Sequence, residues 1–174
     1  KQVGDSSILR RLTKDLKKNP DGPAQGADVI AGITFDGIDS ASSALANCLT
    51  VVLSDEEIQA YLRQHPEDID SAVREAMRLE TPLPALQRGT TAPIVYAGIE
   101  IPKGVNLLMA WGCGSRDPSA YANPNGFNLK RKNRTLLAFG GGTRFCKGRT
   151  LALTQCATAL RLLFAQTDWI ELIK

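Results

Sequence analysis

Residues 139–148 read Phe139-Gly140-Gly141-Gly142-Thr143-Arg144-Phe145-Cys146-Lys147-Gly148, a glycine-rich turn that presents one cysteine directly before an apolar segment. Glycine permits the tight turn in which successive backbone N–H groups can point at a thiolate. Arg144, Lys147 and the start of the following helix place positive charge near the sulfur, which favours the thiolate over the thiol. We therefore predict that Cys146 is a metal ligand. A loop that only caps a helix beside a buried cysteine is the alternative interpretation.

Five residues of this stretch fall at the spacing Phe-x-x-Gly-x-Arg-x-Cys-x-Gly, namely Phe139, Gly142, Arg144, Cys146 and Gly148. The spacing resembles the cysteine loop of the cytochrome P-450 family of heme-thiolate monooxygenases, and the resemblance covers nearly the whole chain. Two other glycine-rich loops are excluded, because residues 140–147 contain neither G-x-x-x-x-G-K-[ST] nor G-x-G-x-x-G. The resemblance implies heme b as the cofactor and Cys146 as its iron ligand. It also implies that Phe139 lies against the heme ring, with Gly140 and Gly148 beside the cofactor.

Residues 26–53 are predicted to form one long helix, with small residues dense in its middle and apolar side chains on both sides. Both sides are therefore expected to be buried. Gly37 lies in the helix interior, where glycine costs about 1 kcal/mol relative to alanine. We expect that the missing side chain allows another group to lie close to the helix at this residue.

The same helix carries the segment Asp36-Gly37-Ile38-Asp39-Ser40-Ala41, which resembles the family pattern [Ala/Gly]-Gly-x-[Asp/Glu]-Thr-[Thr/Ser]. Gly37, Asp39 and Ser40 match, with serine in place of threonine, whereas the first and last positions depart from the pattern. The resemblance implies that this is the distal helix, which crosses the heme and opens a groove for oxygen. An acid beside a hydroxyl can deliver protons to bound dioxygen. A capping or helix-bending role for Asp39 and Ser40 is the alternative.

Glu75 and Arg78 are spaced three apart on a predicted helix that reaches about residue 79, so they can form a charge pair on one face. They resemble the family's Glu-x-x-Arg pair, which is buried and ties its helix to the segment before the cysteine loop. The family commonly adds an arginine from a Pro-x-Arg-Phe stretch, and this chain has Gly126 at that position. We therefore expect the network to lack its third member. The basic cluster at 130–134 is interpreted as a solvated loop.

Arg88 and Arg144 resemble the two family arginines that hold the heme propionates. Guanidinium groups bind carboxylates in bidentate geometry, so two of them flanking one cofactor would set its orientation. Each can also be an ordinary surface charge, which is the alternative interpretation.

Short β-type runs at 94–96, 99–101 and 105–109, separated by turn signals, predict a small antiparallel sheet. Amphipathic patterns predict helices over 5–18, from Ser54-Asp55 onward and from Pro66 to about residue 79. After the cysteine loop, an apolar stripe should pack the last helix on the long one, and its members are Leu153, Ala157, Leu160 and Phe164. The expected fold class is mainly α with a small antiparallel β-sheet, and the resemblance implies the C-terminal portion of the cytochrome P-450 fold.

The composition is that of one ordinary globular domain, with 174 residues, 43% hydrophobic and 22% charged. A net charge of +3 gives no reason to expect binding to nucleic acid. The four cysteines form no C-x-x-C pair, and Cys48 and Cys156 lie on apolar helical faces, so a reducing compartment is expected. No stretch is long and apolar enough to span a membrane, and no signal peptide is visible. We expect a soluble, cytoplasmic protein of the bacterial type, with a membrane anchor in a missing N-terminus left open.

The resemblance implies a monooxygenase that splits dioxygen at heme iron and transfers one oxygen atom to a small organic substrate. Because no nicotinamide or flavin fingerprint is present, electrons would come from a separate ferredoxin or flavoprotein reductase. Two alternatives stay open: a peroxide-using enzyme or isomerase of the same fold, and a non-catalytic heme-binding fragment. We expect residues 1–174 to be the C-terminal part of a single domain, with the N-terminal part absent or supplied by a partner polypeptide.

Overall fold

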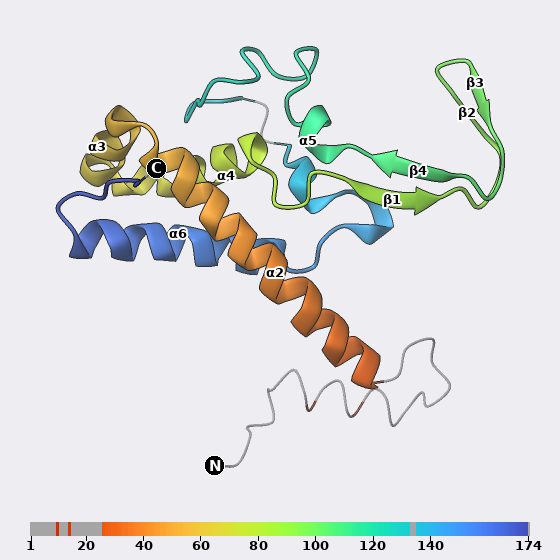
Figure 1. Cartoon of the computed structure of the whole chain (residues 1–174), viewed down its shortest axis with the longest axis horizontal. Coiled ribbons are helices and arrows are strands. Elements are labelled where there is room, and N and C mark those ends of the chain that lie inside the picture. Colours follow the sequence, from red (N-terminus) through yellow and green to blue (C-terminus); the bar gives the residue numbers. More distant parts are fainter. Residues whose placement is uncertain (1–9, 11–13, 15–25, 133–134, 174) are drawn as a thin grey trace. The chain divides into compact units, whose positions relative to one another are not determined.

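The computed structural model describes residues 10, 14, 26–132 and 135–173 (Figure 1). The chain divides into two compact units, Lys1–Asp39 and Ser40–Lys174, which are considered separately. The helix predicted over residues 5–18 lies outside the described part, apart from Arg10 and Lys14, which are both helical.

Helix α2, Gly26–Leu53, has the bounds that the sequence predicts and continues from the first unit into the second. Three large apolar side chains in its earlier part are more than half exposed, at 57% for Ile33, 78% for Phe35 and 59% for Ile38. The expectation that both sides of this helix are buried is therefore wrong for that part, because apolar composition permits burial but supplies no neighbouring element. In the second unit, Ala44, Cys48 and Val52 recur every four residues and are buried on one face.

The two helices that follow begin as the sequence predicts. Helix α3, Glu56–Gln64, is capped by the Asp55 carboxylate, whose Oδ1 accepts the N–H of Glu57 at 2.9 Å and of Ile58 at 3.1 Å. The next helix begins as a short 3-10 turn, η1 (Pro66–Asp68), and continues as α4, Ile69–Leu79. Proline suits this start because its missing N–H would have had no helical partner.

Helix α4 forms the centre of the core, since eight of its eleven residues are buried. Helix α6, Arg149–Gln166, packs mainly on α4 rather than on the long helix. Its expected apolar stripe is confirmed, with Ala157 and Leu160 buried and Leu153 and Phe164 partly buried against the same cluster. The prediction of its partner is correct only in part, because α6 meets the long helix at Cys48 and Cys156 but packs mostly on α4.

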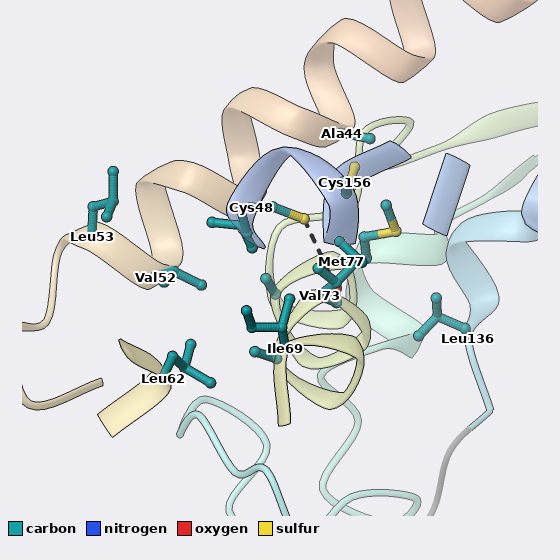
Figure 2. Close-up of a cluster of buried hydrophobic side chains, with 14 residues drawn as sticks. Ala44, Cys48, Val52, Leu53, Leu62, Ile69, Val73, Met77, Leu136 and Cys156 are labelled. Carbon is teal, nitrogen blue, oxygen red and sulfur yellow. Dashed lines mark hydrogen bonds between the residues drawn. The ribbon is translucent and has the colours of Figure 1, made fainter. Parts of the chain in front are cut away.

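Helices α2 and α6 meet where Cys48 and Cys156 lie in the core (Figure 2). Both thiols are free and buried, as the apolar faces predict. A hydrogen bond with Cys156 and burial raise the pKa of Cys48, whose Sγ also donates to the Val73 carbonyl at 3.9 Å. Cys48 therefore stays a neutral thiol and contributes as a small apolar side chain.

In the part of the chain that the structure describes, the β structure consists of two two-stranded antiparallel sheets instead of one. Strand β2, Ile94–Tyr96, pairs with β3, Ile99–Ile101, and β1, Leu86–Gly89, pairs with β4, Asn106–Met109. Figure 1 shows the β2–β3 hairpin at the far end of the β1–β4 ladder. Strand β1 was not predicted, because Leu86-Gln87-Arg88-Gly89 has no β-branched or aromatic residue and pairs with a strand that lies distant in sequence.

The segment after α6 is held by two side chains of α3. Gln59 is fully buried, and its amide donates to the Ile170 carbonyl at 3.0 Å and accepts the Ile170 N–H at 3.1 Å. The Arg63 guanidinium lies 4.6 Å from the centre of the Phe164 ring and donates to backbone carbonyls of Phe164 and Thr167. These contacts fix the C-terminal segment against α3.

We expect Gln59→Leu to destabilise the protein by about 2 kcal/mol, because the N–H and carbonyl of Ile170 would lose their partner inside the protein. Urea denaturation measures the change as a shift of the midpoint. Gln64→Leu is the matched control, since Gln64 is the exposed last residue of the same helix. Equal midpoints for the two variants would contradict the assigned role of Gln59.

Within residues 26–132 and 135–173, no helix is both long and apolar enough to cross a lipid bilayer.

Candidate functional site

The cysteine loop, residues 139–148, begins at the end of one short 3-10 turn, contains a second and ends at the start of helix α6. Turn η2 spans Leu137–Phe139, η3 spans Gly142–Arg144, and Gly148 caps the start of α6. Gly140 and Gly142 have φ of +66° and +63°, a left-handed conformation that glycine adopts without the cost that Cβ imposes. The Cys146 N–H donates to the Phe139 carbonyl at 3.0 Å and closes the loop.

The thiol of Cys146 is free and exposed, and it lies three residues before the first helical residue of α6. A Cβ added at Gly148 would lie 3.7 Å from the Cys146 Sγ, so glycine at this position keeps the space beside the sulfur open. Such an exposed sulfur on a glycine-framed turn is available as a ligand. The alternative interpretation assumed a buried cysteine, and Cys146 is exposed; its role as a ligand stays a prediction.

Two aromatic rings and one arginine flank this loop. Phe139 is partly buried and packs against the hydrophobic core, and Phe145 immediately precedes the cysteine. The Arg149 guanidinium carbon lies 6.0 Å from the centre of the Phe139 ring and 5.5 Å from that of Phe145. Arg149 was not predicted from the sequence, because its position over two rings depends on how the loop folds.

Arg88 and Arg144, the predicted propionate ligands, are both exposed side chains of the second unit. Arg88 lies on β1 opposite Leu107, and its Nη1 donates to the neighbouring Gln87 carbonyl at 2.8 Å. Arg144 is the last residue of η3. Among the residues that the structure describes, neither arginine is paired with a carboxylate side chain. Both remain able to bind an acidic group of a ligand.

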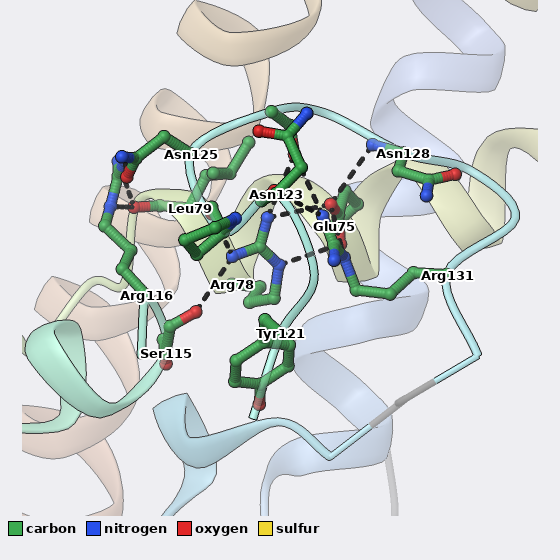
Figure 3. A network of polar contacts seen from close by, with 12 residues as sticks. Glu75, Arg78, Leu79, Ser115, Arg116, Tyr121, Asn123, Asn125, Asn128 and Arg131 are labelled. Carbon is green, nitrogen blue, oxygen red and sulfur yellow. Dashed lines mark hydrogen bonds and ion pairs between the residues drawn. The ribbon is translucent and has the colours of Figure 1, made fainter. Parts of the chain in front are cut away.

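Glu75 and Arg78 form the predicted pair, and it is buried, with 5% of Glu75 and 2% of Arg78 exposed (Figure 3). The Arg78 Nε donates to Oε2 at 2.9 Å and its Nη2 donates to Oε1 at 2.8 Å, which is a bidentate contact. Arg78 also donates to the carbonyls of Ser115, Pro124 and Gly126. The pair therefore connects α4 to the connecting loop before the cysteine.

The expectation that the network lacks a third member is wrong. Arg131 occupies that role, with its Nε 2.9 Å from Oε1 and 3.1 Å from Oε2 of Glu75. The interpretation of residues 130–134 as a solvated loop is also wrong for Arg131, which is only 9% exposed. Its Nη1 donates to Ala122, and its Nη2 donates to Asn123 and Gly126.

Gly126 takes part in the network through its backbone. A Cβ at this residue would collide with the side-chain amide of Asn123. The carbonyl of Gly126 accepts from both Arg78 at 3.2 Å and Arg131 at 3.0 Å. Position 126 therefore contributes a backbone acceptor to the network, and Arg131 supplies the guanidinium from five residues further along the chain.

One carboxylate balances two guanidinium groups here, and backbone carbonyls satisfy the remaining donors. Tyr121 lies beside both cations, 5.2 Å from the Arg78 guanidinium carbon and 5.9 Å from that of Arg131, measured to its ring centre. Its hydroxyl donates to the Thr135 carbonyl at 2.9 Å, and burial raises the pKa of the phenol. The network thus holds the loop from residue 115 to residue 131 in one arrangement.

The predicted distal residues lie next to one another on α2. Gly37 and Asp39 belong to the first unit, and Ser40 is the first residue of the second. A Cβ added at Gly37 would meet no atom of the described residues within 4 Å. Asp39 is exposed and Ser40 is half-buried.

The donor set fits a heme held by a thiolate. Among the described residues, no group of three or more His, Cys, Asp or Glu side chains could hold a bare metal ion. Iron in a macrocycle instead needs one strong protein ligand, and the exposed thiol of Cys146 can supply it. The exposed guanidinium groups of Arg88 and Arg144 suit the acid groups of such a cofactor.

Comparison with known proteins gives one consistent result. The family model for cytochrome P-450 matches residues 26–170. Cytochrome P-450 144 of Mycobacterium tuberculosis is 31% identical over 136 residues, which are 78% of this chain and 31% of that protein. Beta-dihydromenaquinone-9 omega-hydroxylase of the same organism is 35% identical over 113 residues, which are 65% of this chain and 23% of that protein.

Solved structures agree with this match. The P-450 heme domain of Tepidiphilus thermophilus superposes with a TM-score of 0.84 at 24% identity, over 90% of this chain and 38% of that one. This likeness shows the fold. The chain spans about a third of the length of the first curated relatives that it matches.

Proposed function

This chain belongs to the cytochrome P-450 family, and on that premise we propose that it supplies the heme-binding part of a monooxygenase domain that oxidises a small organic substrate with dioxygen. The observation that carries the proposal is the free, exposed thiol of Cys146 in its glycine-framed loop. When bound, the heme would supply the iron centre at which dioxygen is activated. Residues 1–174 would form the C-terminal part of the domain, and the rest of the fold would come from further chain or from a partner polypeptide.

The chain's own residues would hold and tune this cofactor. Cys146 would bind iron as a thiolate and donate electron density to it. Arg88 and Arg144 would bind the propionates through their exposed guanidinium groups, and heme b, which carries two propionates, fits two such donors. Phe139 would cover the sulfur side of the ring and limit access of water, a surrounding that influences the reduction potential.

Proton delivery is the proposed role of the adjacent residues Asp39 and Ser40 on α2. A carboxylate and a hydroxyl next to one another can pass a proton, directly or through one water, to an acceptor within hydrogen-bond reach. Gly37, two residues before Asp39, would leave room for a small ligand beside this part of the helix.

Electrons would come from a separate ferredoxin or flavoprotein reductase, since the sequence holds no nicotinamide or flavin fingerprint. A relative named as an omega-hydroxylase supports hydroxylation as the reaction. Dioxygen and a small organic molecule would be the two substrates.

Isotopic oxygen tests the proposed reaction in the heme-loaded protein, with surrogate ferredoxin and reductase and with laurate and 7-ethoxycoumarin as probes. The proposal expects product that carries label from ¹⁸O₂ and depends on reductant. Product that carries label only from H₂¹⁸O₂, without reductant, would instead support the peroxide-using alternative. That alternative is favoured by one observation, the replacement of the family's threonine by Ser40.

Ser40→Ala is expected to raise the fraction of reducing equivalents released as peroxide roughly tenfold, while heme content stays normal. This effect is smaller than the full rate enhancement that general acid catalysis can give. Parallel assays of reductant consumed, peroxide formed and heme bound measure both effects. Ser43→Ala is the matched control, because Ser43 is an exposed serine on the same helix. Unchanged coupling in both Ser40→Ala and Asp39→Asn would remove the proton-delivery role.

A further inference from the structure

Arg149 contacts both aromatic residues that flank the cysteine loop. It is the first residue of α6 and is half-buried. Its guanidinium carbon lies 5.5 Å from the centre of the Phe145 ring and 6.0 Å from that of Phe139. A planar guanidinium within about 6 Å of an aromatic face is attracted by the ring and can also stack on it.

The two rings belong to the two ends of the loop, and this loop carries the Cys146 sulfur. The Cys146 N–H donates to the Phe139 carbonyl at 3.0 Å, so Phe139 and Cys146 already meet through the backbone. Phe145 is the residue next to Cys146, and Arg149 belongs to the helix that follows. One side chain of α6 thus reaches both ends of the loop beside the backbone bond that closes it.

We propose that Arg149 is a positioning residue for Cys146. By attracting Phe139 and Phe145 to one cation, it keeps the loop closed and fixes the sulfur relative to helix α6. The other basic residues of the loop lack this arrangement, since Arg144 and Lys147 are exposed and no contact of either with an aromatic ring occurs in the described part of the chain. The inference rests on the proposed function only in taking the ligand of Cys146 to be heme.

Three substitutions separate the contributions of charge and shape. Arg149→Leu removes both, Arg149→Lys keeps the charge without the planar group, and Arg149→Gln keeps a planar group without the charge. Arg161→Leu is the matched control, because it makes the same change on the same helix at a residue that is paired with Asp70 at the surface.

The first measurement is hydrogen exchange at the Cys146 amide in the heme-loaded protein. Loss of two cation–π contacts in Arg149→Leu is expected to speed this exchange about tenfold, with Arg149→Lys in between and Arg161→Leu unchanged. The second measurement is the ferrous–CO spectrum. Arg149→Leu is expected to move part of the red-shifted, thiolate-type Soret band toward the band of a heme without a thiolate ligand.

A double-mutant cycle with Phe145→Leu decides between positioning and a general structural role. If Arg149 acts through the rings, its replacement will have a much smaller effect once Phe145 is already leucine. Exchange in Arg149→Leu within twofold of wild type, or equal effects of Arg149→Leu in both backgrounds, would overturn the inference. If Arg149→Leu fails to fold, the same comparison is made with Arg149→Lys. If the wild-type protein lacks the thiolate-type band, the result counts against the proposed function. The role of Arg149 is then decided by the amide exchange rates alone.

Discussion

Glu75→Ala is expected to abolish heme incorporation, because it leaves the guanidinium groups of Arg78 and Arg131 buried without a carboxylate. Breaking a buried ion pair by removing one partner costs about 3–5 kcal/mol, which is a large part of the stability of an ordinary domain. Here one carboxylate serves two cations, so the loss falls at the upper end of that range. The ratio of heme to protein and the urea midpoint of the purified variant measure the effect.

Glu80→Ala is the control for this change. Glu80 also pairs with an arginine, Arg116, at 2.7 Å, but its side chain is 52% exposed. An exposed pair contributes about 0.2–1 kcal/mol, so heme content should stay near that of the wild type. Comparable losses of heme in Glu75→Ala and Glu80→Ala would show that the buried network is no more important for heme binding than an exposed ion pair.

Cys146→Ser is expected to remove the red-shifted Soret band of the ferrous–CO protein completely. A serine hydroxyl replaces the soft thiolate that the loop presents, and a neutral oxygen does not donate electron density to iron in the same way. An optical spectrum of the reduced protein under carbon monoxide, recorded for wild type and variant at equal heme concentration, measures the change.

The other cysteines give the controls, because each is free in the structure. Cys113→Ser changes an exposed thiol outside the loop and should leave the band in place. Cys48→Ala and Cys156→Ala remove buried core sulfurs and should lower stability without altering the spectrum. Retention of the red-shifted band in Cys146→Ser would show that the ligand is another residue.

The cysteine loop and the long helix were predictable from sequence because their signals are local. Gly140 and Gly142 mark backbone conformations that only glycine adopts easily, and a helix start can be recognised from the residues at its cap, such as Asp55. The buried pair of Glu75 and Arg78 was likewise predictable from its spacing and the family resemblance. Its burial depends on the loop that covers it.

The missed features depend on contacts between distant parts of the chain. Arg131 reads as one charge in a basic cluster, and only the folded loop shows that it lies beside Glu75, 56 residues away. Strand β1 exists because β4 pairs with it, and its own residues carry no strand signal. Arg149 is a shorter-range case, because its partners lie four and ten residues before it and only the fold of the loop brings both rings to its guanidinium.

The exchange of roles between positions 126 and 131 has a consequence for protein engineering. A design that follows the family pattern Pro-x-Arg-Phe would place arginine at 126, yet both oxygens of Glu75 already accept from Arg78 and Arg131. The new guanidinium would have no carboxylate left to bind, and its Cβ would displace the side chain of Asn123. We therefore expect the two positions to be coupled, so that Gly126→Arg destabilises the protein less when Arg131 has already been replaced.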